Sequence, residues 1–455
     1  MCRKTCRSCV QKQAAFCEQR IQSRPEIFFR GGNYDRNTEK TASADYDIRS
    51  FCNLFYRISP CMVYQPYVME QAGWSQGQAS MCFYLALSTF VFGNIVGGRM
   101  QNRFKEKTIV WIGGGIFAAG ILASTFLIVP TPLPMYLSYG VMQGFGQGMI
   151  YTVILATVQR WFPDRTGFAS GVVVTANGLC GFFLAPLSRK LLEAEGVQKT
   201  FLIIGAAIAV SWILCGIFFQ APDKSLVNAG GSAAKPGTSE MKQYTSGEMM
   251  RTRNFYLLLA TMFFGLISYF MVSPVSQTYQ IDLGIPSAVA VSAVMLGSIV
   301  NAGARLVLPT LADKVGRIVC IKGVLIVAVI AMGVLAVSRS LAVTVAVVLM
   351  YGCYGGIMGS FQSLTSSIFG MKHTGENYGF VMFGIVFATF GAPAISGLVS
   401  RKGYEMNVVF GIGAVFAVIA FVCLTLLGRN LVKEHAEKSA GVKNDTAQVS
   451  KPQAE

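Results

Sequence analysis

The sequence predicts an all-α membrane protein built from two similar helix bundles, and three observations support this fold class. Of the 455 residues, 53% are hydrophobic and only 13% are charged, whereas soluble proteins average about 25% charged residues. The apolar residues gather in runs of about 20, which is the length of a helix that crosses a bilayer. A polar, Gly/Ser-rich stretch over residues 221–252 divides these runs into two sets. Isolated strands cannot satisfy their backbone in lipid, so we expect the runs to be helices.

Eleven apolar segments are clear, five before the polar stretch and six after it. The two sets carry related motifs, because Thr-Gly-x-x-x-Gly opens one segment in each set and Ala-Pro follows near the far end of both. Repeated halves on either side of a linker are typical of pseudo-symmetric bundles. We therefore expect twelve helices, six in each bundle. The clear segments cover residues 78–98, 108–129, 133–158, 168–188, 200–220, 254–277, 287–311, 321–338, 341–370, 377–400 and 406–428.

The first helix of the first bundle is incomplete in the sequence. Its only candidate, 51–69, is half apolar and is interrupted by Arg57, Pro60 and Pro66. We expect a shortened first helix here; a shifted reading frame or a misplaced start explains the segment equally well. The predicted organisation is an atypical polar N-terminal extension (1–50), an N-terminal bundle (51–220), a linker (221–252), a C-terminal bundle (253–428) and a disordered tail (429–455).

The net charge of +16 follows the loops and does not indicate nucleic-acid binding. Basic residues such as Arg99 and Arg103 follow alternate segments and also fill the linker, whereas the other connections carry few charges. Cytoplasmic loops are enriched in Lys and Arg, so we expect the linker and the C-terminus in the cytoplasm and the protein in the plasma membrane. The twelve cysteines are scattered, and Cys6-x-x-Cys9 has no second pair or nearby histidine. We expect neither a metal site nor a cofactor.

Arg305 is the charged residue that lies deep within an apolar segment. An arginine at membrane depth costs about 2.5–3.5 kcal/mol on insertion scales, and none of the eleven segments contains an Asp or Glu to offset this cost. The missing counter-charge is therefore expected to be a bound anion. Asn301 lies one turn earlier on the same helix face, and we expect it to bind the same anion. In the alternative interpretation, the Arg305 side chain extends to the membrane interface near Asp313, which lies about 12 Å along the helix.

Three stretches carry a resemblance to a known family. They are 70–75 (Glu-Gln-Ala-Gly-Trp-Ser), 160–171 (Arg-Trp-Phe-Pro-Asp-Arg-Thr-Gly-Phe-Ala-Ser-Gly) and 301–305 (Asn-Ala-Gly-Ala-Arg). Over roughly residues 62–428 the chain resembles the oxalate/formate antiporter family of the major facilitator superfamily, which is related to the monocarboxylate transporters. The resemblance implies the major facilitator fold and a small carboxylate substrate bound by Arg305.

The same resemblance implies that Tyr151, Tyr351 and Tyr354 line a cavity between the bundles, although ordinary packing explains each tyrosine equally well. It also implies a gating role for the superfamily's loop motif, whose charges hold helix ends together on the cytoplasmic side. Asn102 stands in place of the motif's aspartate, so the first copy is weakened, and its residues are alternatively ordinary loop charges. The residues expected in this role are Asp313, Lys314, Gly316, Arg317, Asn102, Arg103, Asp164 and Arg165.

Two departures from the related families shape the expected function. Segment 377–400 contains no Lys or Arg, where oxalate-selective relatives carry a lysine, so a single fixed charge favours a monocarboxylate. Asn301 stands where proton-coupled relatives carry an aspartate. We expect a monomeric secondary transporter of anions such as formate, oxalate, lactate or pyruvate, working by anion exchange or uniport. The alternatives are a proton-linked monocarboxylate symporter and a non-transporting receptor or scaffold. We expect no enzyme, because the segments hold no nucleophile–base pair.

Overall fold

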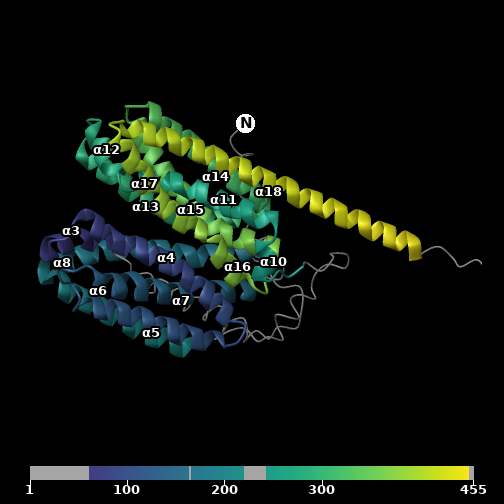
Figure 1. The fold of residues 1–455 in the computed structure, drawn as a ribbon, viewed down its shortest axis with the longest axis horizontal. Coiled ribbons are helices and arrows are strands. Elements are labelled where there is room, and N and C mark those ends of the chain that lie inside the picture. The colour runs from purple at the N-terminus through teal and green to yellow at the C-terminus, as the bar shows by residue number, and fades with distance from the viewer. Residues whose placement is uncertain (1–60, 163–164, 220–241, 450–455) are drawn as a thin grey trace, which may run out of the picture. The chain divides into compact units, whose positions relative to one another are not determined.

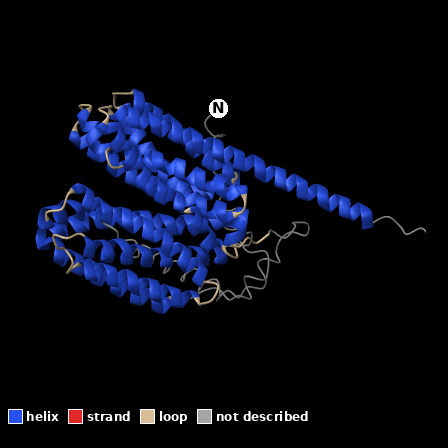
Figure 2. Cartoon of the chain, in the orientation of Figure 1, coloured by secondary structure: helices blue, strands red, loops and turns tan. Residues whose placement is uncertain are grey.

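The computed structural model describes residues 61–162, 165–219 and 242–449, and most of them lie in helices (Figures 1 and 2). The chain divides into two compact units, Met1–Asp47 and Ile48–Glu455, and every described residue belongs to the second. Within the described residues there are helices and loops but no strand (Figure 2), so the all-α fold class is confirmed. The expected N-terminal extension and most of the linker lie outside the described residues.

The elements of the first half pack mainly against one another. Helix α7 lies against α4 and α5, and α5 also lies against α8. Small residues allow close approach, since a Cβ at Gly148 of α7 would collide with the Phe90 carbonyl of α4. The elements are α3 (Cys61–Ala72), α4 (Gln76–Met100), α5 (Glu106–Ser124), α6 (Leu133–Met135), the π-helix η2 (Tyr136–Gln143), α7 (Gly144–Trp161) and α8 (Thr166–Phe218).

The second half is arranged in the same way around its own contacts. Helix α13 lies against α15, and α18 lies against α11 and α14. Its elements are α10 (Ser246–Met250), α11 (Arg253–Val272), α12 (Ser276–Asp282), α13 (Ser287–Val315), α14 (Arg317–Val337), α15 (Ala342–Phe369), α16 (Thr374–Val381), α17 (Phe383–Arg401) and α18 (Met406–Val449).

Ten helices among the described residues are long and apolar enough to cross a membrane. They correspond to ten of the eleven segments expected from the sequence. The eleventh, 168–188, falls in the first part of α8, where Thr166–Ala176 is a shorter apolar helix. Gly196 separates this part from the second because its φ of 75° and ψ of 177° are not helical, a conformation that glycine adopts readily.

Two of the observed helices differ from the expected segments in ways that matter for the site. The segment expected at 377–400 begins at Thr374, which brings Glu376 into the first turn of α16. The segment expected at 133–158 contains a π-helical stretch that ends at Gln143. The pattern of apolar residues cannot reveal a π-helix, because a π-helix adds one residue to a helical turn without requiring a different composition. Such stretches often occur at functional sites.

The C-terminal part of the chain also differs from expectation. A disordered tail was expected from residue 429, whereas α18 continues as one helix to Val449 (yellow in Figure 1). The added stretch contains no proline and is rich in Ala, Glu and Lys, which favour helix. Asn254 Nδ2 of α11 donates to Glu434 Oε1 in this stretch at 2.8 Å.

Candidate functional site

Arg305 lies on α13 and is buried, with 4% of its surface exposed. Its Nε donates to Asn301 Oδ1 at 2.8 Å. This bond points back along the helix, away from Asp313, in the direction in which helical side chains lean. The geometry therefore differs from the alternative in which the side chain extends toward Asp313. Among the described residues no ion pair includes Arg305, and its Nη1 is buried without a hydrogen-bond partner.

Three tyrosines of the second half form an aromatic wall beside this guanidinium. The Arg305 Cζ lies 5.4 Å from the ring centroid of Tyr354, within the range of a cation–π contact. Tyr354 stacks on Tyr269 at 4.2 Å between centroids, and Tyr351 meets Tyr269 edge to face at 5.4 Å. The structure thus brings the predicted Tyr351 and Tyr354 together with Arg305. It adds Tyr269 on α11, which nothing in the sequence distinguished from ordinary packing.

The fifth residue predicted to bind substrate lies in the first half. Tyr151 is on α7, with 7% of its surface exposed, and its ring packs against Phe90 of α4 with 5.2 Å between centroids. This contact lies within the first half, whereas the Arg305 cluster belongs to the second. Tyr151 is therefore not part of the aromatic wall.

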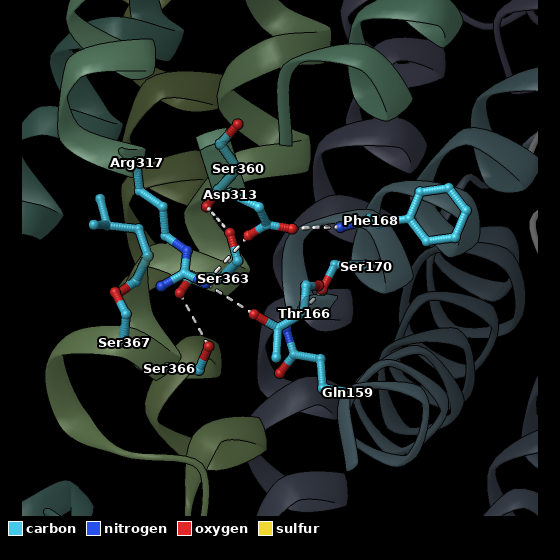
Figure 3. Close-up of polar contacts among 11 residues, drawn as sticks. Gln159, Thr166, Phe168, Ser170, Asp313, Arg317, Ser360, Ser363, Ser366 and Ser367 are labelled. Atoms are coloured by element: carbon cyan, nitrogen blue, oxygen red, sulfur yellow. Dashed lines mark hydrogen bonds and ion pairs between the residues drawn. The ribbon is translucent and has the colours of Figure 1, made fainter. Parts of the chain in front are cut away.

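At one end the two halves are joined through α8 and α13 (Figure 3). Asp313 Oδ2 accepts from the backbone N–H of Phe168 at 3.1 Å, and Arg317 Nη2 donates to Asp313 Oδ1 at 3.2 Å and to Thr166 Oγ1 at 3.0 Å. The Asp313 carboxylate thus lies over the first turn of α8, where the helix dipole favours negative charge. A Cβ at Gly167 would come within 2.5 Å of the Pro309 carbonyl oxygen, so this approach requires glycine.

The other predicted gating residues do not take part in this contact between the halves. Gly316 has a φ of 105° and forms the turn between α13 and α14, a conformation that favours glycine. Lys314, Asn102, Arg103 and Arg165 are exposed. Asp164 lies outside the described residues. The structure therefore brings Asp313 and Arg317 into the contact between halves, and it leaves the first-half motif residues at the surface.

A second joint uses residues that sequence reasoning did not assign to it. Arg99 of α4 pairs with Glu376 of α16, with Nη2 and Oε1 2.8 Å apart, and Arg99 Nε donates to the same oxygen at 2.9 Å. Beside this pair, Thr152 Oγ1 of α7 donates to the Gly375 carbonyl at 3.1 Å. We call the end of the molecule that carries these two joints the joined end. No local pattern in the sequence pointed to Glu376 as the partner of Arg99.

The chain just before α11 is fixed to the same end. Asn377 Nδ2 donates to the Tyr244 carbonyl at 3.0 Å, and Ser246 Oγ donates to Asn377 Oδ1 at 2.9 Å. Hydrogen bonds from the backbone and side chain of Thr245 lower the pKa of Glu248. Burial lowers the pKa of His373, and neighbouring Lys372 adds to this effect. Residues 242–250 are thus docked on the start of α16.

Comparison with known proteins identifies the family. The Major Facilitator Superfamily model matches residues 48–390, well over half of the chain. The chain belongs to the major facilitator superfamily. This match begins before residue 62, where the resemblance to the narrower antiporter family was expected to start, and it includes the interrupted segment 51–69. Superfamily members are transporters and not enzymes, so the protein is a multi-pass integral membrane transporter of a small substrate.

Individual members of the superfamily are similar to this chain at modest identity. The oxalate:formate antiporter of Oxalobacter formigenes is 27% identical over 335 residues, which cover 73% of this chain and 78% of that protein. Monocarboxylate transporter 11 of Homo sapiens is 28% identical over 230 residues, 50% of this chain and 47% of that protein. The superfamily transporter FucP, crystallised in the outward conformation, has a TM-score of 0.64 at 15% identity, covering 84% of this chain and 99% of that chain. The last similarity concerns the fold alone.

Proposed function

We propose that this transporter moves small carboxylate anions, such as formate, oxalate, lactate or pyruvate, with Arg305 as their anchor. The observation that carries the proposal is the buried guanidinium whose Nη1 has no protein partner in the described structure. A buried charge without a partner is strongly unfavourable. A carboxylate supplies both the missing charge and the missing acceptor, and it matches the planar fork of an arginine with two parallel hydrogen bonds.

Asn301 and Tyr354 prepare the guanidinium for this task. The Asn301 oxygen fixes Nε at 2.8 Å, so the Arg305 side chain does not have to be ordered when the anion binds. The Arg305 Cζ lies over the face of the Tyr354 ring, so an aromatic ring helps to hold the guanidinium in place. The site is thus organised before binding, which reduces the entropy lost on association.

One fixed positive charge favours a monocarboxylate over a dianion. The relatives include an oxalate:formate antiporter and a monocarboxylate transporter by name, and both names specify carboxylates. Here 377–400 adds no second Lys or Arg. Because Asn301 is neutral, the α13 site offers no carboxylate to carry a proton, so we favour anion exchange or uniport over proton symport.

Access to Arg305 would alternate between the two sides of the membrane as the halves rock about the site. The positive-inside rule supports a cytoplasmic location for the joined end, because Arg103, Lys105 and Lys107 follow α4 there. In this arrangement the linker and the C-terminal end of α18 face the cytoplasm of a plasma-membrane transporter, and a monomer contains the complete site.

Counterflow in proteoliposomes with labelled carboxylates tests the proposal. Arg305→Ala should abolish uptake, and Arg305→Lys should weaken apparent affinity by about tenfold to a hundredfold, since a charged hydrogen bond contributes about 1.5–3 kcal/mol. Arg401→Ala is the matched control, because Arg401 is exposed at the end of α17, and it should transport normally. Wild-type uptake by a folded Arg305→Ala variant would refute the proposal, and acidification that accompanies uptake would favour the proton-linked alternative.

A further inference from the structure

A cavity of about 460 Å³ lies where the end of α4 meets the start of α16. Its polar lining among the described residues consists of Arg99, Asn102, Arg103 and Glu376. Two arginines against one carboxylate give this lining a net positive charge. The volume is within the range of about 300–1,000 Å³ that is usual for small-ligand sites. The joint between the halves accounts for Arg99 and Glu376, but it gives the cavity itself no role.

The two arginines keep most of their hydrogen-bond donors for a ligand. Arg99 binds a single oxygen, Glu376 Oε1, through Nη2 at 2.8 Å and Nε at 2.9 Å, and its side chain is 67% exposed. A guanidinium carries five N–H donors, so several remain. Arg103 is exposed and forms no ion pair with any described residue. Because both side chains line one cavity, a single anion can contact both.

An apolar stripe on α4 leads from these arginines into the membrane. Phe92, Val96 and Arg99 follow one another at spacings of four and three residues, so they share one helix face. Phe92 is 49% exposed and Val96 is 38% exposed, and both lie in the membrane-crossing stretch Gly77–Met100. Asn94, two residues from Val96 and therefore on the opposite side of the helix, is 0% exposed. The stripe thus lies on the outward face of α4, where lipid chains surround the protein.

We propose that this cavity binds the headgroup of an anionic phospholipid, whose acyl chains lie along Val96 and Phe92. The headgroup phosphate would accept charge-assisted hydrogen bonds from Arg99 and Arg103. Phe92 precedes Arg99 by seven residues, about 10 Å along the helix, so charge and apolar surface follow in the order in which a phospholipid presents phosphate and chains. A small free anion would leave the apolar stripe unused, which favours a lipid. The inference does not depend on which substrate is transported.

Asn102 is the residue that makes the cavity suitable for an anion. The related loop motif has an aspartate at this position, and a second carboxylate would cancel the charge of the two arginines. The asparagine amide has nearly the same shape, carries no charge and can donate to a phosphate oxygen. The change that weakens the motif as a lock between the halves therefore favours phosphate binding.

Glu376 links lipid binding to the joint. Its carboxylate and a lipid phosphate compete for Arg99 and repel each other. The phosphate therefore binds more strongly when the halves separate and Glu376 leaves Arg99. A ligand that binds one arrangement better shifts the equilibrium toward it, so anionic lipid favours separation of the joined end.

The test measures which lipid the full-length protein retains. Native mass spectrometry after equilibration with equal amounts of phosphatidylglycerol and phosphatidylcholine should show preferential retention of phosphatidylglycerol by wild type. Arg103→Gln and Asn102→Asp should each lower this preference about fivefold, the effect of one charge near a membrane surface. Glu376→Gln should raise it, because Arg99 loses its competing partner.

Lys107→Gln is the matched control. Lys107 is an exposed basic residue of the same loop, but it does not line the cavity, and its Nζ donates to the Ile217 carbonyl at 3.0 Å. Its variant should keep the wild-type preference. An equal loss of preference in Lys107→Gln would show that general loop charge attracts the lipid, and the cavity site would be refuted.

A second measurement locates the lipid and separates it from a free anion. Phosphatidylglycerol with a photoreactive acyl chain should label the part of α4 that carries Phe92 and Val96, and inorganic phosphate at millimolar concentration should not prevent this labelling. Equal retention of the two lipids by wild type would overturn the proposal, as would an unchanged preference in folded Arg103→Gln and Asn102→Asp proteins. Loss of labelling in inorganic phosphate would identify a site for free anions instead of lipid and would also overturn it.

Discussion

Neutralising Glu376 should shift the equilibrium between the joined and the separated arrangement of the two halves at the joined end. In the pair with Arg99, the Glu376 side chain is 9% exposed and the Arg99 side chain is 67% exposed. Exposed ion pairs contribute about 0.2–1 kcal/mol. The buried carboxylate places this pair near the upper limit, and the exposed guanidinium keeps it from exceeding that limit. We therefore expect Glu376→Gln to weaken the joint by about 1 kcal/mol, a fivefold change in population.

Double electron–electron resonance measures this population directly. Spin labels at Asn102 and Lys372, which are exposed near the end of α4 and before α16, report the separation of the halves at the joined end. Glu376→Gln should increase the population of longer distances about fivefold. Arg99→Gln should act alike, and the double variant should add little to either, since both remove the same interaction.

The chain offers a matched control for this experiment. Glu405 pairs with Arg339 at 3.2 Å, but their side chains are 69% and 72% exposed and both lie in the second half. Glu405→Gln should leave the distance distribution unchanged. Equal distributions in wild-type and Glu376→Gln proteins would show that the pair does not hold the halves together, and the reasoning from its burial would be wrong.

Three further predictions follow from other parts of the molecule. Single cysteines introduced at 103 and 235 should resist an impermeant thiol reagent on intact cells, because both positions are assigned to the cytoplasm; efficient labelling of either would overturn that assignment. The lowered pKa of Glu248 means that its carboxylate favours the folded segment at neutral pH. This contribution is lost as pH falls below about 4, so the protection of 245–252 against hydrogen exchange, relative to the intrinsic rate at each pH, should fall there in wild type but not in Glu248→Gln, whose protection should be low throughout. Deletion of residues 1–45, which belong to the separate unit Met1–Asp47, should leave expression and transport unchanged, and loss of folding would show that the extension is structural.

Interactions within a helix could be predicted from the sequence. The four-residue spacing of Asn301 and Arg305 indicates a shared helix face, and the structure shows a 2.8 Å hydrogen bond between them. Asp313 and Arg317 have the same spacing and form an ion pair at 3.2 Å, but this pair spans the turn at Gly316 between α13 and α14, so helix geometry alone did not predict it. Ten of the eleven apolar segments likewise correspond to long apolar helices near the expected positions, because bilayer thickness constrains composition directly.

Interactions between distant segments could not be predicted in this way. Arg99 and Glu376 are 277 positions apart, and their contact depends on how α4 packs against α16. Tyr269 joins the aromatic wall only because α11 lies beside α15. The extension of α18 to Val449 was missed because a charged, polar composition is common to disordered tails and to exposed helices.

Helix α13 connects the proposed substrate anchor to the joint between the halves. It carries Arg305 and, about 12 Å further along, Asp313. The neighbouring α8 follows it throughout this distance: a Cβ at Gly171 would lie 3.0 Å from the Arg305 carbonyl oxygen, and Phe168 bonds to Asp313. Rocking the halves apart must break these contacts together, because α13 spans them as one helix. An anion bound between Arg305 and the first half would add contacts in only some arrangements of the halves, and this difference in contacts is what allows a ligand to shift a conformational equilibrium.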